Sequence, residues 1–147
     1  MRKDTISIGG ASGFWGDSIT GPMQLVASGR LDFLVFDYLA ELTMSLLASA
    51  RMKNPESGYA TDFVSVAMRA VLKDALAQNI RIIANAGGVN PRGCAAALQA
   101  LADELGVSVR IAVVEGDDVM PLLPTLRDEA VRELQSGRPL PDKVVSA

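Results

Sequence analysis

Residues 31–42 have the sequence LDFLVFDYLAEL, and this stretch decides the fold class. Its first six residues are nearly continuously apolar, which is typical of a parallel strand covered on both faces. Asp37 ends this run, and the helical spacing of apolar residues after it predicts a helix from about Ala40 to Met52. A strand followed directly by a helix is half of a βαβ unit, so we expect a parallel sheet. The expected buried face of the helix consists of Leu42, Thr43, Leu46, Leu47 and Ala50.

The same alternation of short apolar runs and helical segments continues along the chain. Further strands are predicted at 5–8, 81–84 and 107–114, and further helices after Pro22, over 61–77, from Asn90-Pro91 to Gly106, and over 125–134. We therefore predict an α/β fold, with a three-layer open parallel sheet of about four βα units that resembles flavodoxin and Rossmann folds and can be part of a larger domain. In a strand order 2-1-3-4, the reversal between the first and third strands would mark the ligand crevice.

Composition limits the classes of function. The 147 residues carry a net charge of -3 and are 49% hydrophobic. With a pI near 4.9 and no basic stripe, the chain is not expected to bind nucleic acid. No apolar run approaches the roughly 20 residues that cross a bilayer, and the N-terminus has no signal-peptide pattern, so we expect no membrane association and a cytoplasmic location. One domain is predicted over 4–136, followed by an extended tail or truncated linker over 137–147.

The chain contains no histidine and one cysteine, Cys94. Without histidine there is no Ser-His-Asp or Cys-His machinery, so acid–base chemistry falls to carboxylates, lysine or tyrosine. Cys94 is expected to be a small buried helix residue, the alternative being a nucleophile. The acids Glu115, Asp117 and Asp118 could contact a divalent cation but form an incomplete ligand set, so no metal site is predicted. The sequence indicates no particular cofactor.

Glycine-rich and amide-rich segments follow the first and third predicted strands. Residues 9–21 form a long loop, GGASGFWGDSITG, and residues 85–92 are NAGGVNPR. Glycines allow a close approach of the backbone to a ligand, and a helix N-terminus attracts an anion. The predicted anion-binding residues are Gly10, Ser12, Gly13, Gly16, Asp17, Asn85, Gly87, Gly88, Asn90 and Arg92. The structural alternatives are a surface turn with Trp15 folded onto the core and ordinary helix capping by Asn90.

Asp37 and Glu41 lie four residues apart at the start of the helix that follows the second strand. Carboxylates are the main acid–base groups left to this chain, so we predict these two as the catalytic residues. The alternative is that they only favour the positive end of the helix dipole. Tyr38, between them, could donate a proton or simply pack.

Three of these segments together resemble the N-terminal region of the acyclic terpene utilisation (AtuA-like) family. They are GGASGFWGD at 9–17, LDFLVFDYLAELT at 31–43 and NAGGVNP at 85–91, and the resemblance covers about residues 5–118. It implies a catabolic protein for branched acyclic terpenoids such as citronellol and geraniol, which are broken down through CoA thioesters. The family-like positions are Gly10, Ser12, Gly13, Gly16, Asp17, Asp37, Glu41, Asn85, Gly87, Asn90 and Pro91. Family members are longer, so we expect a fragment, a cleaved subunit or a truncated chain.

We therefore expect a catabolic enzyme, or its ligand-binding portion, that acts on a small organic acid or acyl-CoA through carboxylate acid–base chemistry. The alternative is a noncatalytic metabolite-binding or docking module that needs a partner domain or chain. The expected partners are a small carboxylate or acyl-CoA ligand, and either further copies in a homo-oligomer or a missing C-terminal portion or partner subunit.

Overall fold

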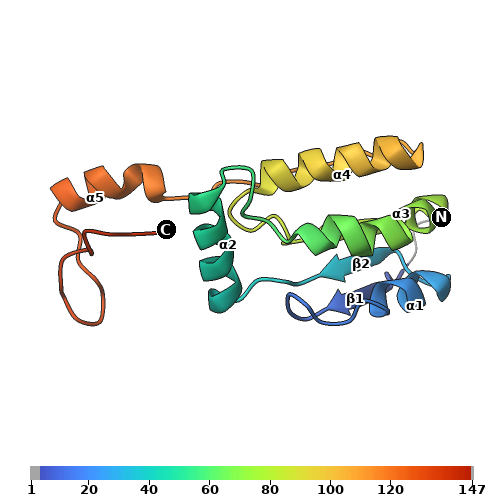
Figure 1. Ribbon diagram of the computed structural model, residues 1–147. Coiled ribbons are helices and arrows are strands. Elements are labelled where there is room, and N and C mark those ends of the chain that lie inside the picture. Colours follow the sequence, from blue (N-terminus) through green and yellow to red (C-terminus); the bar gives the residue numbers. More distant parts are fainter. Residues whose placement is uncertain (1–3, 147) are drawn as a thin grey trace. The chain divides into compact units, whose positions relative to one another are not determined.

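The computed structural model describes residues 4–146, which form two compact units (Figure 1). The first unit, Met1–Val113, contains β1 (Ile8–Ser12), α1 (Gly21–Ala27), β2 (Phe33–Phe36), α2 (Glu41–Lys53), the π-helical turn η1 (Phe63–Met68), α3 (Arg69–Ala77), β3 (Arg81–Ala84) and α4 (Pro91–Leu105). The second unit, Val114–Ala147, contains the 3-10 turn η2 (Met120–Leu122) and α5 (Leu123–Asp128). The single domain over 4–136 stays a prediction.

The three strands form a parallel sheet, which confirms the predicted α/β class with an open parallel sheet. Their order is β1-β2-β3, so the expected order 2-1-3-4 is wrong and no reversal lies between the first and third strands. β2 is central because it is the most apolar strand: Leu34 is 0% and Phe36 is 1% exposed. The less apolar strands, with the pair Gly9–Gly10 in β1 and Arg81 in β3, take the edges.

β1 begins at Ile8 and continues to Ser12, whereas the sequence predicts a strand over 5–8 that ends before the glycines. A Cβ on Gly9 would lie 2.8 Å from Leu31 Cδ1, so a glycine here lets Leu31 close over the strand. The register with β2 is irregular between Gly10 and Ser12. The glycine-rich loop therefore starts four residues later than expected, after Ser12.

The segment 107–114, predicted as a fourth strand, pairs with no strand in the part of the chain that the structure describes. Its side chains still alternate, since Val107, Val109 and Ile111 are half-buried while Ser108 and Arg110 are exposed. Alternation decides which side chains point inward, but a strand also needs a neighbour about 4.8 Å away for its hydrogen bonds. The fourth βα unit is therefore incomplete.

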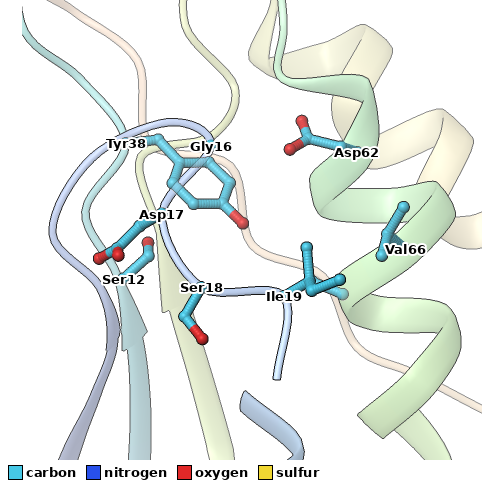
Figure 2. A pocket seen from close by; sticks show the side chains of 9 residues that line it. Ser12, Gly16, Asp17, Ser18, Ile19, Tyr38, Asp62 and Val66 are labelled. Carbon is cyan, nitrogen blue, oxygen red and sulfur yellow. The ribbon is translucent and has the colours of Figure 1, made fainter. Parts of the chain in front are cut away.

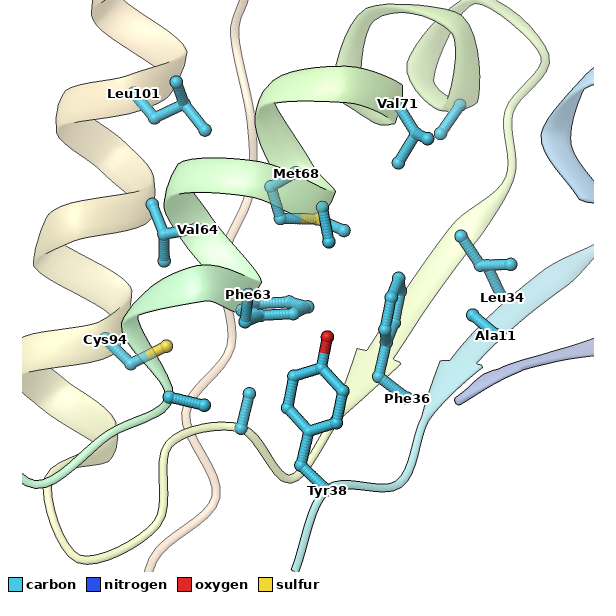
Figure 3. Close-up of a cluster of buried hydrophobic side chains, with 14 of the residues drawn as sticks. Ala11, Leu34, Phe36, Tyr38, Phe63, Val64, Met68, Val71, Cys94 and Leu101 are labelled. Carbon is cyan, nitrogen blue, oxygen red and sulfur yellow. The ribbon is translucent and has the colours of Figure 1, made fainter. Parts of the chain in front are cut away.

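The core lies between the sheet and the helices that pack on one of its faces (Figure 3). Leu34 and Phe36 point from β2 toward Phe63 and Met68 of η1, and α1 packs against α3. The Phe36 and Phe63 rings meet edge to face with centroids 5.2 Å apart, and the Tyr38 ring joins them at 6.1 Å from Phe63. Edge-to-face pairs add to the stabilisation that burial provides. In Figure 1, α4 lies over η1 and α3 as a further layer.

The other face of the sheet is only partly covered. Ile8 of β1 is 58% exposed and Ile83 of β3 is 54% exposed, whereas the adjacent Gly9 is buried and Ile82 is half-buried. Between them Phe33 and Val35 of β2 are half-buried. Parallel sheets are usually covered on both faces, so this surface is unusual for its class.

Three of the predicted helices are confirmed. α1 has Pro22 in its first turn and is followed by Gly29 at a φ of 67°. The helix predicted over 61–77 is continuous through η1 and α3, and α4 begins after the cap Asn90 and ends at Gly106 in a left-handed conformation. Among residues 4–146, none of the helices combines the length and the apolar character needed to cross a bilayer.

The remaining helices differ from expectation. α2 has the predicted length, but its buried face consists of Thr43, Leu47 and Ala48, while Leu42 is 72% and Leu46 is 53% exposed. The apolar residues of α2 occupy a wider face of the helix than the neighbouring elements cover, so part of that face stays exposed. In the second unit, the helix predicted over 125–134 ends at Asp128, because the chain turns at Ala130 with a φ of 54°.

Candidate functional site

The carboxyl ends of the three strands meet at one edge of the sheet, and Asn85 connects two of them. Its Nδ2 donates to Asp37 Oδ1 at 2.7 Å, and its Oδ1 accepts from the Tyr38 backbone N–H at 2.7 Å. The backbone N–H of Asp37 in turn donates to the Ser12 carbonyl at 3.2 Å. Two predicted site residues, Asp37 and Asn85, are therefore in direct contact, and Ser12 lies beside them.

The glycine-rich loop after β1 is held in shape by its own carboxylate. Asp17 Oδ2 accepts from the Gly13 backbone N–H at 2.9 Å, and the Asp17 N–H donates to the Phe14 carbonyl at 3.2 Å. Gly16, between them, has a φ of 87°, a conformation that a side chain would disfavour. A Cβ on Gly10 or Gly16 would meet no atom within 4 Å, so both backbones face open space.

A small cavity of about 20 Å³ lies where this loop meets β2 and η1 (Figure 2). Its lining residues are Ser12, Gly16, Asp17, Ser18, Ile19, Tyr38, Asp62, Val66 and Ala67. Figure 2 shows the Tyr38 hydroxyl pointing into the space between the loop and the helix that carries Asp62 and Val66. Three predicted binding residues, Ser12, Gly16 and Asp17, thus line one cavity.

Trp15 and Asp62 close the loop onto the helix. Trp15 Nε1 donates to Asp62 Oδ1 at 2.6 Å, and the half-buried Trp15 ring also packs against the core. Asp62 directly precedes the π-helical turn η1, and such turns occur frequently at functional sites. Asp62 is not among the predicted site residues, because an acid at a helix start has an ordinary structural explanation. Its bond to Trp15, 47 residues away, is a tertiary contact that spacing does not predict.

Tyr38 packs in the core, and its hydroxyl also reaches the cavity, while its role as a proton donor stays a prediction. Its side chain is 6% exposed and forms edge-to-face pairs with Phe36 and Phe63. Burial is the main cause that raises the pKa of Tyr38 to about 12, and the negative charge of Asp62 acts in the same direction. The hydroxyl therefore stays protonated at neutral pH and acts as a hydrogen-bond donor rather than a base.

The polar and glycine residues of the loop after β3 mainly make contacts within the protein itself. Asn90 Oδ1 accepts from the Gly93 backbone N–H at 3.0 Å, and its Nδ2 donates to the Ser57 carbonyl at 3.0 Å. Asn90 is 9% exposed, and both of its side-chain polar atoms are used within the fold. The first bond caps α4, and the second holds the segment that precedes η1 in place. A Cβ on Gly87 would lie 2.8 Å from Pro91 Cα, which shows that this backbone approaches its own chain closely. The ligand-binding role of Asn90, Gly87 and Gly88 stays a prediction.

The remaining predicted residues lie on the surface. Glu41 is exposed in the first turn of α2, and Arg92 is exposed in the first turn of α4. Asp37 is also exposed, although Asn85 orients its carboxylate. In residues 4–146, no group of three or more Asp, Glu, Cys or His side chains is arranged to hold a metal ion, and the acids at 115–118 form no such group.

Cys94 is buried in α4, as predicted. Burial raises the pKa of its thiol to about 11. At pH 8 we expect folded protein to react with a disulfide reagent such as DTNB about a hundredfold more slowly than urea-unfolded protein, because the thiolate is scarce and covered. The rate should rise with pH toward the folded pKa. Rapid stoichiometric labelling of the native protein at pH 8 would contradict the buried, unreactive assignment.

Comparison with known proteins identifies a family. Residues 6–147 match the family model described as Acyclic terpene utilisation family protein AtuA. No curated protein and no solved structure matches the chain.

Proposed function

The chain belongs to the acyclic terpene utilisation family AtuA, and on that premise we propose that it binds a small organic acid or its CoA thioester at the strand-end edge of the sheet. The family indicates a part in acyclic terpene utilisation. For the chemical step, we assign acid–base catalysis to Asp37 and Glu41. Gly10, Ser12, Gly13, Gly16 and Asp17 would form the loop side of the site, and Asn85, Gly87, Gly88, Asn90 and Arg92 the opposite side.

The observation that carries this proposal is the Asp37–Asn85 pair at the end of the central strand. The 2.7 Å bond from Asn85 Nδ2 occupies Asp37 Oδ1 and orients the carboxylate, while the side chain stays exposed to a ligand. A catalytic base needs such an orientation together with access to the group whose proton it takes. In open α/β sheets, ligands bind outside the carboxyl ends of the strands, where this pair lies, although the order β1-β2-β3 has no reversal that would mark a crevice.

The charges at this edge favour one orientation of an acyl-CoA. Asp17, Asp37 and Asp62 contribute carboxylates here, so the phosphates of CoA are better placed away from them. Ile19 is 70% exposed and Val66 is 45% exposed, and both line the cavity. These two side chains offer apolar contact to a branched hydrocarbon chain. The acyl end, rather than the nucleotide, would therefore lie at the cavity.

A thermal-shift experiment tests this proposal. We expect the CoA thioester of a branched acyclic terpenoid acid to raise the melting temperature of the full chain, because a ligand that binds only the folded state stabilises it. Free CoA is the matched control and should shift it less. Incubation followed by chromatography then asks whether the thioester is consumed. The absence of any shift with the thioester at millimolar concentration would overturn the proposal.

A noncatalytic docking module is the second candidate function. The observation in its favour is the partly uncovered sheet face, where Ile8 and Ile83 are both more than half exposed. Exposed apolar patches of this kind often mark a protein interface. A docking module should respond in the melting experiment only to its protein partner, whereas the proposed enzyme should respond to the thioester alone and then consume it.

A further inference from the structure

The cavity at the strand ends contains a buried hydroxyl without a partner. Ser12 Oγ is shielded from solvent, and no group within the described residues lies at hydrogen-bond distance and angle from it. The Tyr38 hydroxyl is its polar neighbour, close enough that Ser12 acts to lower the pKa of Tyr38. Buried polar groups are nearly always hydrogen-bonded, so Ser12 Oγ is free to bond to an oxygen atom of a water or a ligand. The adjoining space of about 20 Å³ accommodates one water-sized group. Size and polarity therefore suit a single oxygen atom beside Ser12.

A second hydroxyl reaches the same space. Tyr38 is 6% exposed, and its hydroxyl points into the cavity (Figure 2). It carries its proton at neutral pH, as an ordinary tyrosine does, and burial raises its pKa further, to about 12. A tyrosine hydroxyl can then donate to the oxygen of a ligand, while a serine hydroxyl can either donate or accept. The two together suit a carbonyl oxygen or an alcohol.

The two carboxylates that line the cavity disfavour the binding of a negatively charged ligand group. Asp17 and Asp62 both line it, and among the described lining residues there is no lysine or arginine. Asp62 is held in place by Trp15 at 2.6 Å, and Asp17 by the Gly13 N–H at 2.9 Å. A ligand carboxylate in this space would face two fixed carboxylates without a compensating cation. An uncharged oxygen avoids that repulsion.

We propose that Ser12 and Tyr38 together bind an uncharged oxygen of the ligand, a thioester carbonyl or an alcohol hydroxyl, and that the cavity discriminates against a free carboxylate. This inference rests on the proposed function and narrows its ligand from organic acids in general to their neutral derivatives. Asp17 and Asp62 are the discriminating residues, and Trp15 is a positioning residue that fixes Asp62.

The test uses Trp15 as a reporter, since it is the only tryptophan of the chain and contacts the cavity lining. Citronellol serves as the probe with an uncharged oxygen, and citronellate provides the same carbon skeleton with a carboxylate. Both are titrated into the full chain at pH 7, with tryptophan fluorescence and calorimetry as readouts. We expect citronellol to bind at least about tenfold more tightly than citronellate.

Two variants and two matched controls complete the test. Ser12→Ala and Tyr38→Phe should each weaken citronellol binding about three- to tenfold, as expected for one lost hydrogen bond, while keeping the melting cooperative. Ser65→Ala removes a hydroxyl that bonds to the Thr61 carbonyl at 3.0 Å outside the cavity lining, and Tyr59→Phe alters the other tyrosine. Both controls should bind as the wild type does.

The outcomes separate this inference from the proposed function. If citronellol binds the wild type, but equally well binds Ser12→Ala and Tyr38→Phe, the hydroxyl pair is wrong while ligand binding stands. Citronellate binding as tightly as citronellol would overturn the discrimination. If neither probe nor the thioester binds the wild type, the proposed function fails and the inference fails with it.

Discussion

Replacing Gly88 by alanine is expected to destabilise the protein by about 2–5 kcal/mol, because the added methyl group meets both an unfavourable backbone conformation and a close contact. Gly88 has a φ of 52°, which costs an alanine roughly 1–2 kcal/mol. The added Cβ would also lie 2.4 Å from Leu47 Cδ1 and 2.7 Å from the Gly58 carbonyl oxygen. Relieving such overlap in a packed region costs about 1–3 kcal/mol more.

A matched variant separates the two contributions. Gly106 has a φ of 68°, but a Cβ there would meet no atom within 4 Å. Gly106→Ala should therefore show the backbone cost alone, about 1–2 kcal/mol. Urea unfolding of both variants and the wild type measures the difference as a shift in midpoint. Equal destabilisation of the two would contradict the close contact of α2 with the loop after β3.

Local patterns predicted the helices well, because their signals lie within the helices themselves. Asn90, Pro91 and Gly106 mark both ends of α4, and each acts as its residue type suggests. The same local signals do not determine how strands are ordered. The central place of β2 depends on the relative burial of whole strands, and the unpaired segment 107–114 depends on a neighbour that alternation cannot supply.

The candidate site, like the fold, follows only in part from local sequence patterns. A parallel sheet brings its strand ends together, so Asp37 and Asn85 could be expected to lie near one another, and they share a hydrogen bond. The cavity also depends on Asp62, whose place is set by the contact of Trp15 with a distant helix. That contact arises from tertiary packing, and the spacing of residues in the sequence does not predict it.

Replacing Asp37 by asparagine is expected to reduce turnover of a thioester substrate by a factor of about 10²–10⁴, the range that general acid–base groups contribute. The substitution preserves shape, and an asparagine Oδ1 can still accept the bond that Asn85 Nδ2 donates to Asp37 at 2.7 Å. The fold should therefore persist, and the melting temperature provides the check. Asp74→Asn removes an exposed carboxylate from α3 and should leave turnover unchanged.

Glu41→Gln distinguishes a catalytic pair from a single base. Glu41 is exposed in the first turn of α2, where its charge favours the helix dipole by about 0.3–1 kcal/mol. If Glu41 acts only through the dipole, its amide variant loses some stability but keeps its turnover. If both carboxylates exchange protons with the substrate, each single variant loses turnover, and the double variant loses about as much as the worse of the two, because groups that act as a unit are not additive. Undiminished turnover in the double variant would remove the acid–base assignment altogether.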